Sequence, residues 1–287
     1  MVYDDKDRKI EEFFKWIVER TRIQQKKERG DPWPWTEDSI LKEYKFTNAF
    51  RERDKTTVWF RENIRDPLKL EPEVYMATVI FRWFNLIETG ETLLKHNLHI
   101  DWDPEKAYTA IVPQKKWITG AYMVKSPTAM NKVRGVCQTI TTLWNDRQNF
   151  IDRCPWKTLQ KMTNFLEGYP FLGPFLAYEL ATDLRHTYIG SSATDINEWA
   201  NAGPGAMRGL NRIHGRDLHY TSKRHDWCSE MRELLENHQF YIAIFFGEDI
   251  ELEMRDIEHS LCEFDKYERV RLGQGTPRSK YTYKGNL

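Results

Sequence analysis

Asp195 lies between two glycine-containing turns that could each hold a phosphate group. A Gly-Pro pair at Gly173 precedes it, and a Gly-Pro-Gly turn from Gly203 to Gly205 follows it. Glycine lets a phosphate approach the backbone, and a helix that starts at such a turn offers unpaired N–H donors. Asp195 could then act electrostatically or as a general base on a nucleotide extruded from DNA. The alternative is a pair of ordinary helix caps, with Asp195 capping the helix after it.

Cationic side chains are the natural partners of a phosphate at such turns. Arg51, Arg53 and Lys55 lie within five residues of one another. Because Glu52 and Asp54 lie between them, a solvated helix face remains the alternative to a phosphate site. Arg82 lies inside an apolar run, so it requires an anion, which is either a structural carboxylate or a substrate phosphate. The expected phosphate or DNA contacts are Arg51, Arg53, Lys55, Arg82, Asn85 and Arg208, besides the three glycines.

A second candidate pair lies near the carboxyl terminus. His259 and Glu263 are four residues apart, so on a helix they share a face, and the carboxylate could tune the imidazole as a base. A surface ion pair is the alternative. Arg269 and Arg271 then lead into a basic tail, residues 271–287. This tail is expected either to close over DNA as a flexible segment or to be a disordered terminus.

The composition bounds the class of protein. The 287 residues are 40% hydrophobic, which predicts a packed core, and 43 basic residues balance 43 acidic ones. That balance argues against a general nucleic-acid coat, although the stretch 205–224 is locally basic. Aromatic residues reach 14% and suit either a core or base stacking. The four cysteines form no Cys-x-x-Cys pair, so a zinc ribbon is not expected, and a reducing cytoplasm is the expected compartment. No cofactor and no metal-ligating residue is predicted, and the need for a metal ion stays open.

Helical periodicity dominates the chain. Thr36 is the expected N-cap of a helix, and Pro72 is expected in the first turn of another. Residues 241–246 suit a strand or a helix equally. We expect a mainly α fold in which residues 1–287 form one helical catalytic unit, with 1–125 and 126–270 as alternative lobes. The predicted helices cover 10–18, 71–87, 105–110, 126–150, 156–167, 175–184, 194–200, 204–213, 224–240 and 249–267.

Residues 169–177 together with Asp195 resemble the helix-hairpin-helix DNA glycosylase superfamily. In that superfamily a hairpin of the form Leu-x-Gly-x-Gly-x-x-x-Ala binds a DNA phosphate, and a catalytic Asp follows about twenty residues later. Gly173 and Ala177 match the end of the hairpin, whereas Tyr169 and Phe171 depart from it and no lysine nucleophile is present. The resemblance implies a glycosylase-like helical fold with base flipping, and the departures weaken base excision as the activity.

A broader resemblance joins the chain to phage proteins of thymidine hypermodification. That group comprises the amino-acid:DNA transferases, also called α-glutamyl/putrescinyl thymine pyrophosphorylases, and the related helical domain of 5-hydroxymethyluracil DNA kinases. The chain has no Gly-x-x-x-x-Gly-Lys-Ser/Thr motif, so it carries no Walker-type kinase centre of its own. The runs that carry the resemblance are 45–54 (KFTNAFRERD), 81–85 (FRWFN), 117–122 (WITGAY), 201–210 (NAGPGAMRGL) and 256–267 (DIEHSLCEFDKY).

This resemblance implies a transferase that acts on modified thymidine in DNA. An amine from an amino acid such as glycine, or from a polyamine, would replace pyrophosphate on a 5-hydroxymethyluracil base. Its partners would be double-stranded DNA containing modified thymidine and a 5-hydroxymethyluracil DNA kinase, with no membrane, in the host cytoplasm if the gene belongs to a phage. The alternatives are a non-catalytic helical DNA-binding partner of such a kinase and a DNA glycosylase.

Overall fold

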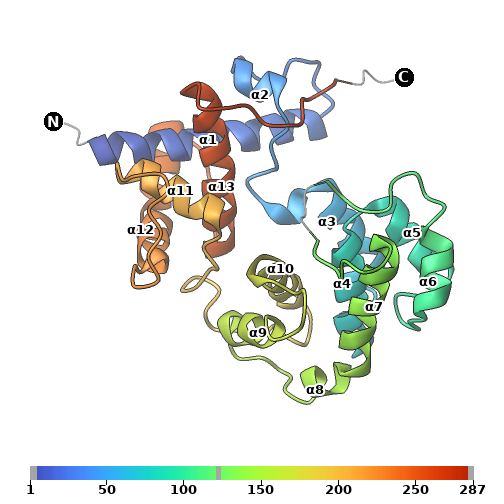
Figure 1. Ribbon diagram of the computed structural model, residues 1–287. Coiled ribbons are helices and arrows are strands. Elements are labelled where there is room, and N and C mark those ends of the chain that lie inside the picture. Colours follow the sequence, from blue (N-terminus) through green and yellow to red (C-terminus); the bar gives the residue numbers. More distant parts are fainter. Residues whose placement is uncertain (1–4, 121–123, 284–287) are drawn as a thin grey trace. The chain divides into compact units, whose positions relative to one another are not determined.

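The computed structural model describes residues 5–120 and 124–283 (Figure 1). Regular structure in these residues is helical, and the only β pairing among them is an isolated antiparallel bridge between Tyr44 and Lys280. The mainly α fold class is therefore confirmed, whereas the likeness to helix-hairpin-helix glycosylases stays a prediction. Residues 121 and 122 of the 117–122 run, and residues 284–287 of the basic tail, lie outside the described residues.

The chain forms two compact units, and the first is discontinuous in sequence. Unit 1 combines the residues up to Asp54 with those from Asn197 onward, and unit 2 spans Lys55–Ile196. The chain thus passes between units at residues 54–55 and 196–197 rather than near residue 125, because the terminal helices pair with each other. Unit 1 contains α1 (Asp5–Glu28), α2 (Ser39–Glu43), η1 (Arg51–Arg53), α11 (Pro204–Ile213), α12 (Trp227–Gln239), the π-helical turn η3 (Phe240–Phe245) and α13 (Met254–Arg271).

The closest helix packing in unit 1 joins α11 to α13. A Cβ on Gly205 would lie 2.3 Å from Cys262 Sγ, and a Cβ on Gly209 would lie 2.5 Å from the carbonyl oxygen of Leu261. The two glycines are four residues apart and so share one face of α11. Their lack of side chains lets the two helix backbones approach. This packing fixes the position of the α13 side chains, among them His259 and Glu263.

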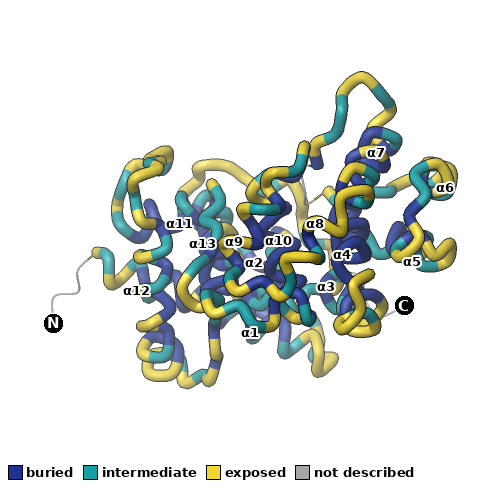
Figure 2. The backbone as a smooth tube through the Cα atoms, turned by 90° about the horizontal axis from the view of Figure 1, so that it is seen from below, coloured by how far each residue is buried: buried dark blue, intermediate teal, exposed yellow. Residues whose placement is uncertain are grey.

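Unit 2 is built around α4, whose residues from Val74 to Phe84 are all buried (Figure 2). The helix ends at Phe84 because Asn85 adopts a left-handed conformation with φ 45°, so residues 86 and 87 lie beyond it. The helices of unit 2 are α3 (Lys55–Phe60), the π-helical turn η2 (Arg61–Arg65), α4 (Glu73–Phe84), α5 (Ile87–Lys95), α6 (Pro104–Ile111), α7 (Lys132–Asn145), α8 (Arg147–Ile151), α9 (Leu159–Leu166) and α10 (Pro174–Leu184).

Several helix ends differ from the sequence predictions for identifiable reasons. Asp38, not Thr36, caps α2, since its Oδ1 accepts the N–H groups of Ile40 and Leu41. The expected helix 126–150 begins only after Asn131, which caps α7, and divides at Asp146. Residues 194–200 form turns and no helix, whereas 241–246 are helical. The prediction for 204–213 matches α11.

The carboxyl-terminal segment packs on unit 1 as far as it is described. Arg271 is the last residue of α13, and the chain then pairs with the segment after α2 through Lys45 N–H to Ser279 O and Tyr281 N–H to Glu43 O. The rings of Tyr281 and Tyr283 stack on Trp33 at centroid distances of 5.6 and 5.4 Å. The tail therefore makes aromatic contacts within unit 1 as far as Tyr283, and its closure over DNA stays a prediction.

Candidate functional site

Thr47 joins two sequence runs that lie far apart in the chain. Its backbone N–H donates to Glu263 Oε2 at 2.9 Å, and its Oγ1 lies 2.8 Å from Nε2 of His259. The 45–54 run therefore packs directly on the 256–267 run within unit 1. We call the polar cluster formed by Arg20, Thr47, Asp54, His259 and Glu263 the Thr47 site.

Glu263 is the most strongly held carboxylate of the Thr47 site. It is buried, and Lys266 Nζ donates to both of its oxygens at 2.9 and 2.6 Å. Burial alone would raise its pKa, but the charge of Lys266, the hydrogen bond from that ammonium and the nearby His259 hold the pKa below its ordinary value. Glu263 therefore stays ionised beside the imidazole, in a buried position rather than on the surface, and its role in tuning His259 stays a prediction.

The loop that carries Thr47 is held in place from α1. Arg20 is buried, and its guanidinium donates to the backbone oxygens of Thr47 and Phe46, each at 3.1 Å. It also reaches Asn48 Oδ1 at 3.4 Å. Burial lowers the pKa of Arg20, with Glu263 and Asp54 among the opposing charges. Sequence reasoning missed Arg20, although its place on the stripe with Phe13 and Ile17 could have revealed it.

Asp54 brings a second acid to this loop. Its Oδ1 accepts the N–H of Asn48 at 3.1 Å, and burial raises the pKa of its carboxyl to about 6 against the lowering effects of that hydrogen bond and of Arg51. A carboxyl with a pKa near neutrality can take up and release a proton at working pH. Perturbed acids and bases gathered in one place are typical of functional sites.

The cations expected beside this loop have different environments. Arg51 is buried, whereas Arg53 is exposed with its guanidinium 4.8 Å from the centroid of the Phe50 ring. Lys55 is exposed and begins α3 in unit 2. Of the three, Arg53 is the exposed cation within unit 1. The phosphate roles of Arg51 and Lys55 stay predictions.

The glycine turn at the start of α11 serves helix packing more than ligand approach. Gly203 is the N-cap residue, and a Cβ there would lie 3.7 Å from Glu258 Oε1, an ordinary contact. Gly205 is buried, and Cys262 Sγ occupies the space where a side chain would begin. Helix α13 fills the Cβ side of Gly205, and the phosphate roles of Gly203 and Gly205 stay predictions.

The basic stretch after α11 begins is largely neutralised by acids. Arg208 Nε donates to Asp265 Oδ2 at 2.7 Å, and Arg212 Nε donates to Oδ1 of the same carboxylate at 2.8 Å. The Arg208 side chain remains 36% exposed, so a phosphate could still reach it. In the last turn of α13, Arg271 donates to both oxygens of Glu268, and Arg269 is half-buried near Gly275.

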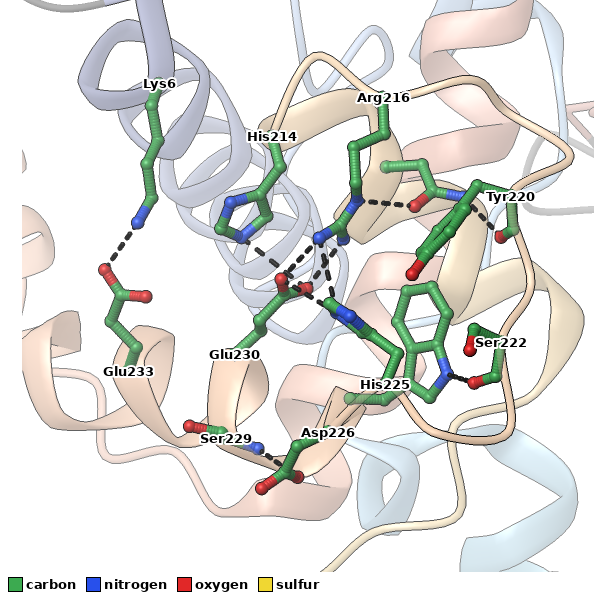
Figure 3. Close-up of polar contacts among 12 residues, drawn as sticks. Lys6, His214, Arg216, Tyr220, Ser222, His225, Asp226, Ser229, Glu230 and Glu233 are labelled. Carbon is green, nitrogen blue, oxygen red and sulfur yellow. Dashed lines mark hydrogen bonds and ion pairs between the residues drawn. The ribbon is translucent and has the colours of Figure 1, made fainter.

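A second polar cluster holds the loop between α11 and α12. Arg216, His214 and His225 converge on Glu230 (Figure 3), with Arg216 Nη2 at 2.7 Å and His225 Nε2 at 3.0 Å from its oxygens. Burial lowers the pKa of His214, while the charges of Arg216 and the histidines contribute to lowering that of Glu230 against burial. The loop side chains Lys223 and Arg224 remain exposed. Sequence reasoning missed this cluster.

Asp195 acts as a helix cap in unit 2. Its Oδ1 and Oδ2 accept the backbone N–H groups of Leu159 and Gln160 at 2.6 and 3.0 Å, and Thr158 satisfies that of Lys161. Both carboxylate oxygens are thus engaged at the start of α9, not at a helix of their own. The catalytic role expected of Asp195 stays a prediction that this geometry does not favour.

Arg82 and Asn85 are also committed inside unit 2. The Arg82 side chain is 1% exposed and bonds both oxygens of Asp183 at 2.6 and 3.0 Å, while Asn85 Oδ1 accepts from it at 2.9 Å. The structural carboxylate is therefore the partner, and the expected phosphate contact by this pair is corrected. Gly173 caps α10 with no atom within 4 Å of an added Cβ, so open space surrounds it.

Two kinds of feature, a metal-binding cluster and a membrane-spanning helix, are not found within the described residues. No group of His, Cys, Asp and Glu in 5–120 and 124–283 is arranged to hold a metal ion. None of the helices within these residues is long and apolar enough to cross a membrane.

Comparisons with known proteins identify the family. Residues 8–276 match the family model described as the 5-hmdU DNA kinase, helical domain. A protein named 5-hmdU DNA kinase from Bacillus phage SP10 is 25% identical over 228 residues, which are 70% of this chain and 35% of that protein. The chain thus spans about a third of the length of this relative. No solved structure matches it. Because the family model covers nearly the whole chain, this protein belongs to the family of the 5-hmdU DNA kinase helical domain.

Proposed function

We propose that this chain acts in thymidine hypermodification by replacing pyrophosphate on a 5-hydroxymethyluracil base in DNA with an amine. Family membership supports DNA with a modified thymidine as the substrate. The Thr47 site supports the chemistry, because it gathers an imidazole, two carboxyls and the buried cation of Arg20 in unit 1. The observation that carries the proposal is the bonding of Thr47 to both Glu263 and His259, which assembles these groups from distant parts of the chain.

The substitution has a simple balance of bonds and protons. The amine nitrogen bonds to the exocyclic methylene carbon while the bond from that carbon to the pyrophosphate oxygen breaks, and pyrophosphate leaves with the electron pair. The new ammonium then releases a proton, for which His259 is the acceptor in our proposal. Glu263 stabilises the imidazolium that results, because it is held ionised by Lys266. Arg53, an exposed cation on the 45–54 run that also carries Thr47, meets the departing anion in our proposal.

Turnover of defined DNA tests the proposal. Duplex DNA carrying pyrophosphorylated 5-hydroxymethyluracil is incubated with the chain and an amine panel, and the digested nucleosides are analysed by mass spectrometry. We expect an amine-substituted nucleoside, and we expect His259→Gln to lower its rate by about 10²–10⁴-fold, the usual contribution of a general base. The exposed His96 provides a matched His→Gln control in unit 2 that should leave the rate unchanged.

A DNA-recognition partner of a kinase is the second candidate function. It is favoured by the match to the helical domain of a longer kinase, of which this chain covers about a third. It predicts binding to modified duplex DNA that weakens steeply with salt, and no new nucleoside with any amine. Release of a free base in the same assay would instead indicate a glycosylase, and intact glycosidic bonds exclude it.

A further inference from the structure

Unit 1 contains a pocket of about 450 Å³ whose walls come from α1, α13 and the start of α2. On α1 the lining residues Glu12, Trp16 and Glu19 recur at helical spacing and therefore share one face. On α13 Phe264 and Glu268 do the same. The volume lies in the range typical of small-molecule sites. We call this cavity the α1–α13 pocket.

The lining of the α1–α13 pocket carries an excess of negative charge. Of its cations, Arg271 is already bound through both oxygens of Glu268, and Lys15 is exposed with no hydrogen bond or ion pair to a described residue. Lys9 and Lys42 reduce the excess from outside the lining by pairing with Glu12 and Glu37. The lining carboxylates are Glu12, Glu19, Glu37, Asp38 and Glu268, against the cations Lys15 and Arg271.

Three of these carboxylates have an oxygen left over. Glu12 uses Oε2 for Lys9 and Arg271, Glu37 uses Oε2 for Lys42, and Glu19 uses Oε1 for the hydroxyl of Thr36. The other oxygen of each makes no hydrogen bond within residues 5–120 and 124–283. By contrast, both oxygens of Asp38 are engaged, one by the cap of α2 and one by the Tyr267 hydroxyl at 2.6 Å. The pocket therefore retains acceptors for an ammonium group.

Aromatic rings complete the lining. Trp16 is only 3% exposed, and its indole Nε1 is a buried donor without a partner among the described residues. Tyr267 and Phe264 lie on the α13 side of the pocket. Rings favour the methylene groups of an aliphatic ligand and also attract an ammonium group over their faces. Carboxylates and rings together suit an alkyl chain that ends in cationic nitrogen.

The α1–α13 pocket adjoins the Thr47 site through Phe46. The ring of Phe46 lies 6.2 Å, centroid to centroid, from both Trp16 and Tyr267, which line the pocket. The next residue, Thr47, bonds Glu263 and His259. Lys266, which pairs with Glu263, lies 4.6 Å from the Phe46 ring centroid. One side chain thus separates the two features.

We propose that the α1–α13 pocket binds the amine co-substrate, and that it selects a net cationic aliphatic amine over a zwitterionic amino acid. The role of the amine as a co-substrate rests on the proposed function, whereas binding of a cationic amine in the pocket does not depend on it. Glu12, Glu19 and Glu37 receive the ammonium groups through their unengaged oxygens. The aromatic lining contacts the alkyl chain, and Phe46 separates the bound amine from the Thr47 site.

Calorimetric titration without DNA tests the pocket alone. The full chain is titrated with 1,4-diaminobutane, with glycine as the zwitterionic comparison, in buffers of matched ionic strength. We expect saturable binding of the diamine at one site and at least about tenfold weaker binding of glycine, since one ammonium–carboxylate hydrogen bond contributes roughly that factor. Absence of diamine binding, or equal binding of glycine, overturns the inference whatever the DNA assay shows.

Paired substitutions locate the diamine. The double variant Glu12→Gln/Glu19→Gln should weaken diamine binding by about tenfold or more, whereas Lys15→Gln should strengthen it by removing a repulsive charge. Glu11→Gln removes one negative charge from α1 outside the pocket lining, as the single variant Glu12→Gln does within it, and should leave the affinity unchanged. Circular dichroism confirms that each variant is folded. An equal effect of Glu11→Gln and the pocket variants would show a general charge effect and contradict the proposal.

The two assays separate the two proposals. If the diamine binds in the pocket but no nucleoside product forms with any amine, the pocket stands and amine transfer fails. If product forms but the Glu12/Glu19 double variant leaves the apparent KM for the diamine unchanged, amine transfer stands and the pocket assignment fails.

Discussion

The two units bury charge in opposite ways. In unit 2 the buried Arg82 is matched by Asp183, Asn85 and Thr57, and the group is closed among apolar helices. In unit 1 the Thr47 site buries Arg20 and Glu263 beside the half-buried His259 and Lys266, and one carboxyl there has a pKa of about 6. A closed pair serves the fold, whereas an open, partly protonated cluster can exchange protons. Burial of a charge is therefore no sign of function until its partners are known.

The largest effect should follow from opening the closed pair. Asp183→Asn leaves the Arg82 cation buried without its counter-charge and should lower the free energy of unfolding by about 3–5 kcal/mol, measured by urea denaturation. Glu105→Gln removes the exposed pair with Arg134 in the same unit and should cost less than about 1 kcal/mol. Equal effects of the two substitutions would remove the contrast between the buried and the exposed ion pair.

The glycine turns offer a second contrast between the units. Gly205→Ala places a methyl group against Cys262 Sγ and should destabilise the protein by about 1–3 kcal/mol, as expected for overpacking. Gly173→Ala meets open space and should change only the cap preference, by less than about 1 kcal/mol. Thermal denaturation of both variants measures the difference. A silent Gly205→Ala would mean that α11 and α13 separate more easily than their packing implies.

The pH dependence of stability tests the Thr47 site. Because the pKa of Asp54 rises from 3.8 to about 6 on folding, the folded state binds this proton more tightly than the unfolded state. This contribution is therefore present at low pH and is lost as pH rises from about 4 to about 6. Asp54→Asn, which keeps an acceptor for the Asn48 N–H, should remove that slope, a change of less than about 2 kcal/mol. Urea denaturation of both proteins at pH 4, 5, 6 and 7 measures it; identical slopes would contradict the shift.

The smallest expected effect distinguishes a cap from a catalytic acid. Asp195→Ala should lower the free energy of unfolding by about 1 kcal/mol, the usual contribution of a cap, and should leave turnover unchanged. The measurements are urea denaturation and the nucleoside assay. A large loss of turnover with unchanged stability would return Asp195 to the role that its position between two glycine turns suggested.

Much of the secondary structure could be predicted from local sequence. The proline after Gly203 begins α11 at the expected residue, and the apolar stripe of residues 10–18 lies within α1. The missed boundaries depend on side-chain contacts that periodicity does not contain. Asn85 ends α4 by adopting a left-handed conformation, and Asp38 competes successfully with Thr36 as a cap. Short-range patterns could not show α3 and α5, whose burial comes from neighbouring helices.

The candidate site was predictable in its parts but not in its assembly. His259 and Glu263 share a helix face, as their spacing indicates. Their partner Thr47 lies more than two hundred residues away, and only its contacts identify it. The basic residues expected to contact DNA were harder to assign, because a sequence gives the sign of a charge but not its partner. Arg208 and Arg212 both pair with Asp265, and Arg271 pairs with Glu268.

The sequence by itself determined the helical class, most helix positions and the family, because these depend on local periodicity and on long runs of residues. Only the tertiary structure decided which polar groups meet. Asp195 and Gly205 have residue types that suit a phosphate site. In the structure, however, Asp195 accepts N–H groups at the start of α9, and Gly205 packs against Cys262 of α13. A functional site requires groups from separate elements within hydrogen-bonding distance, and packing alone sets those distances.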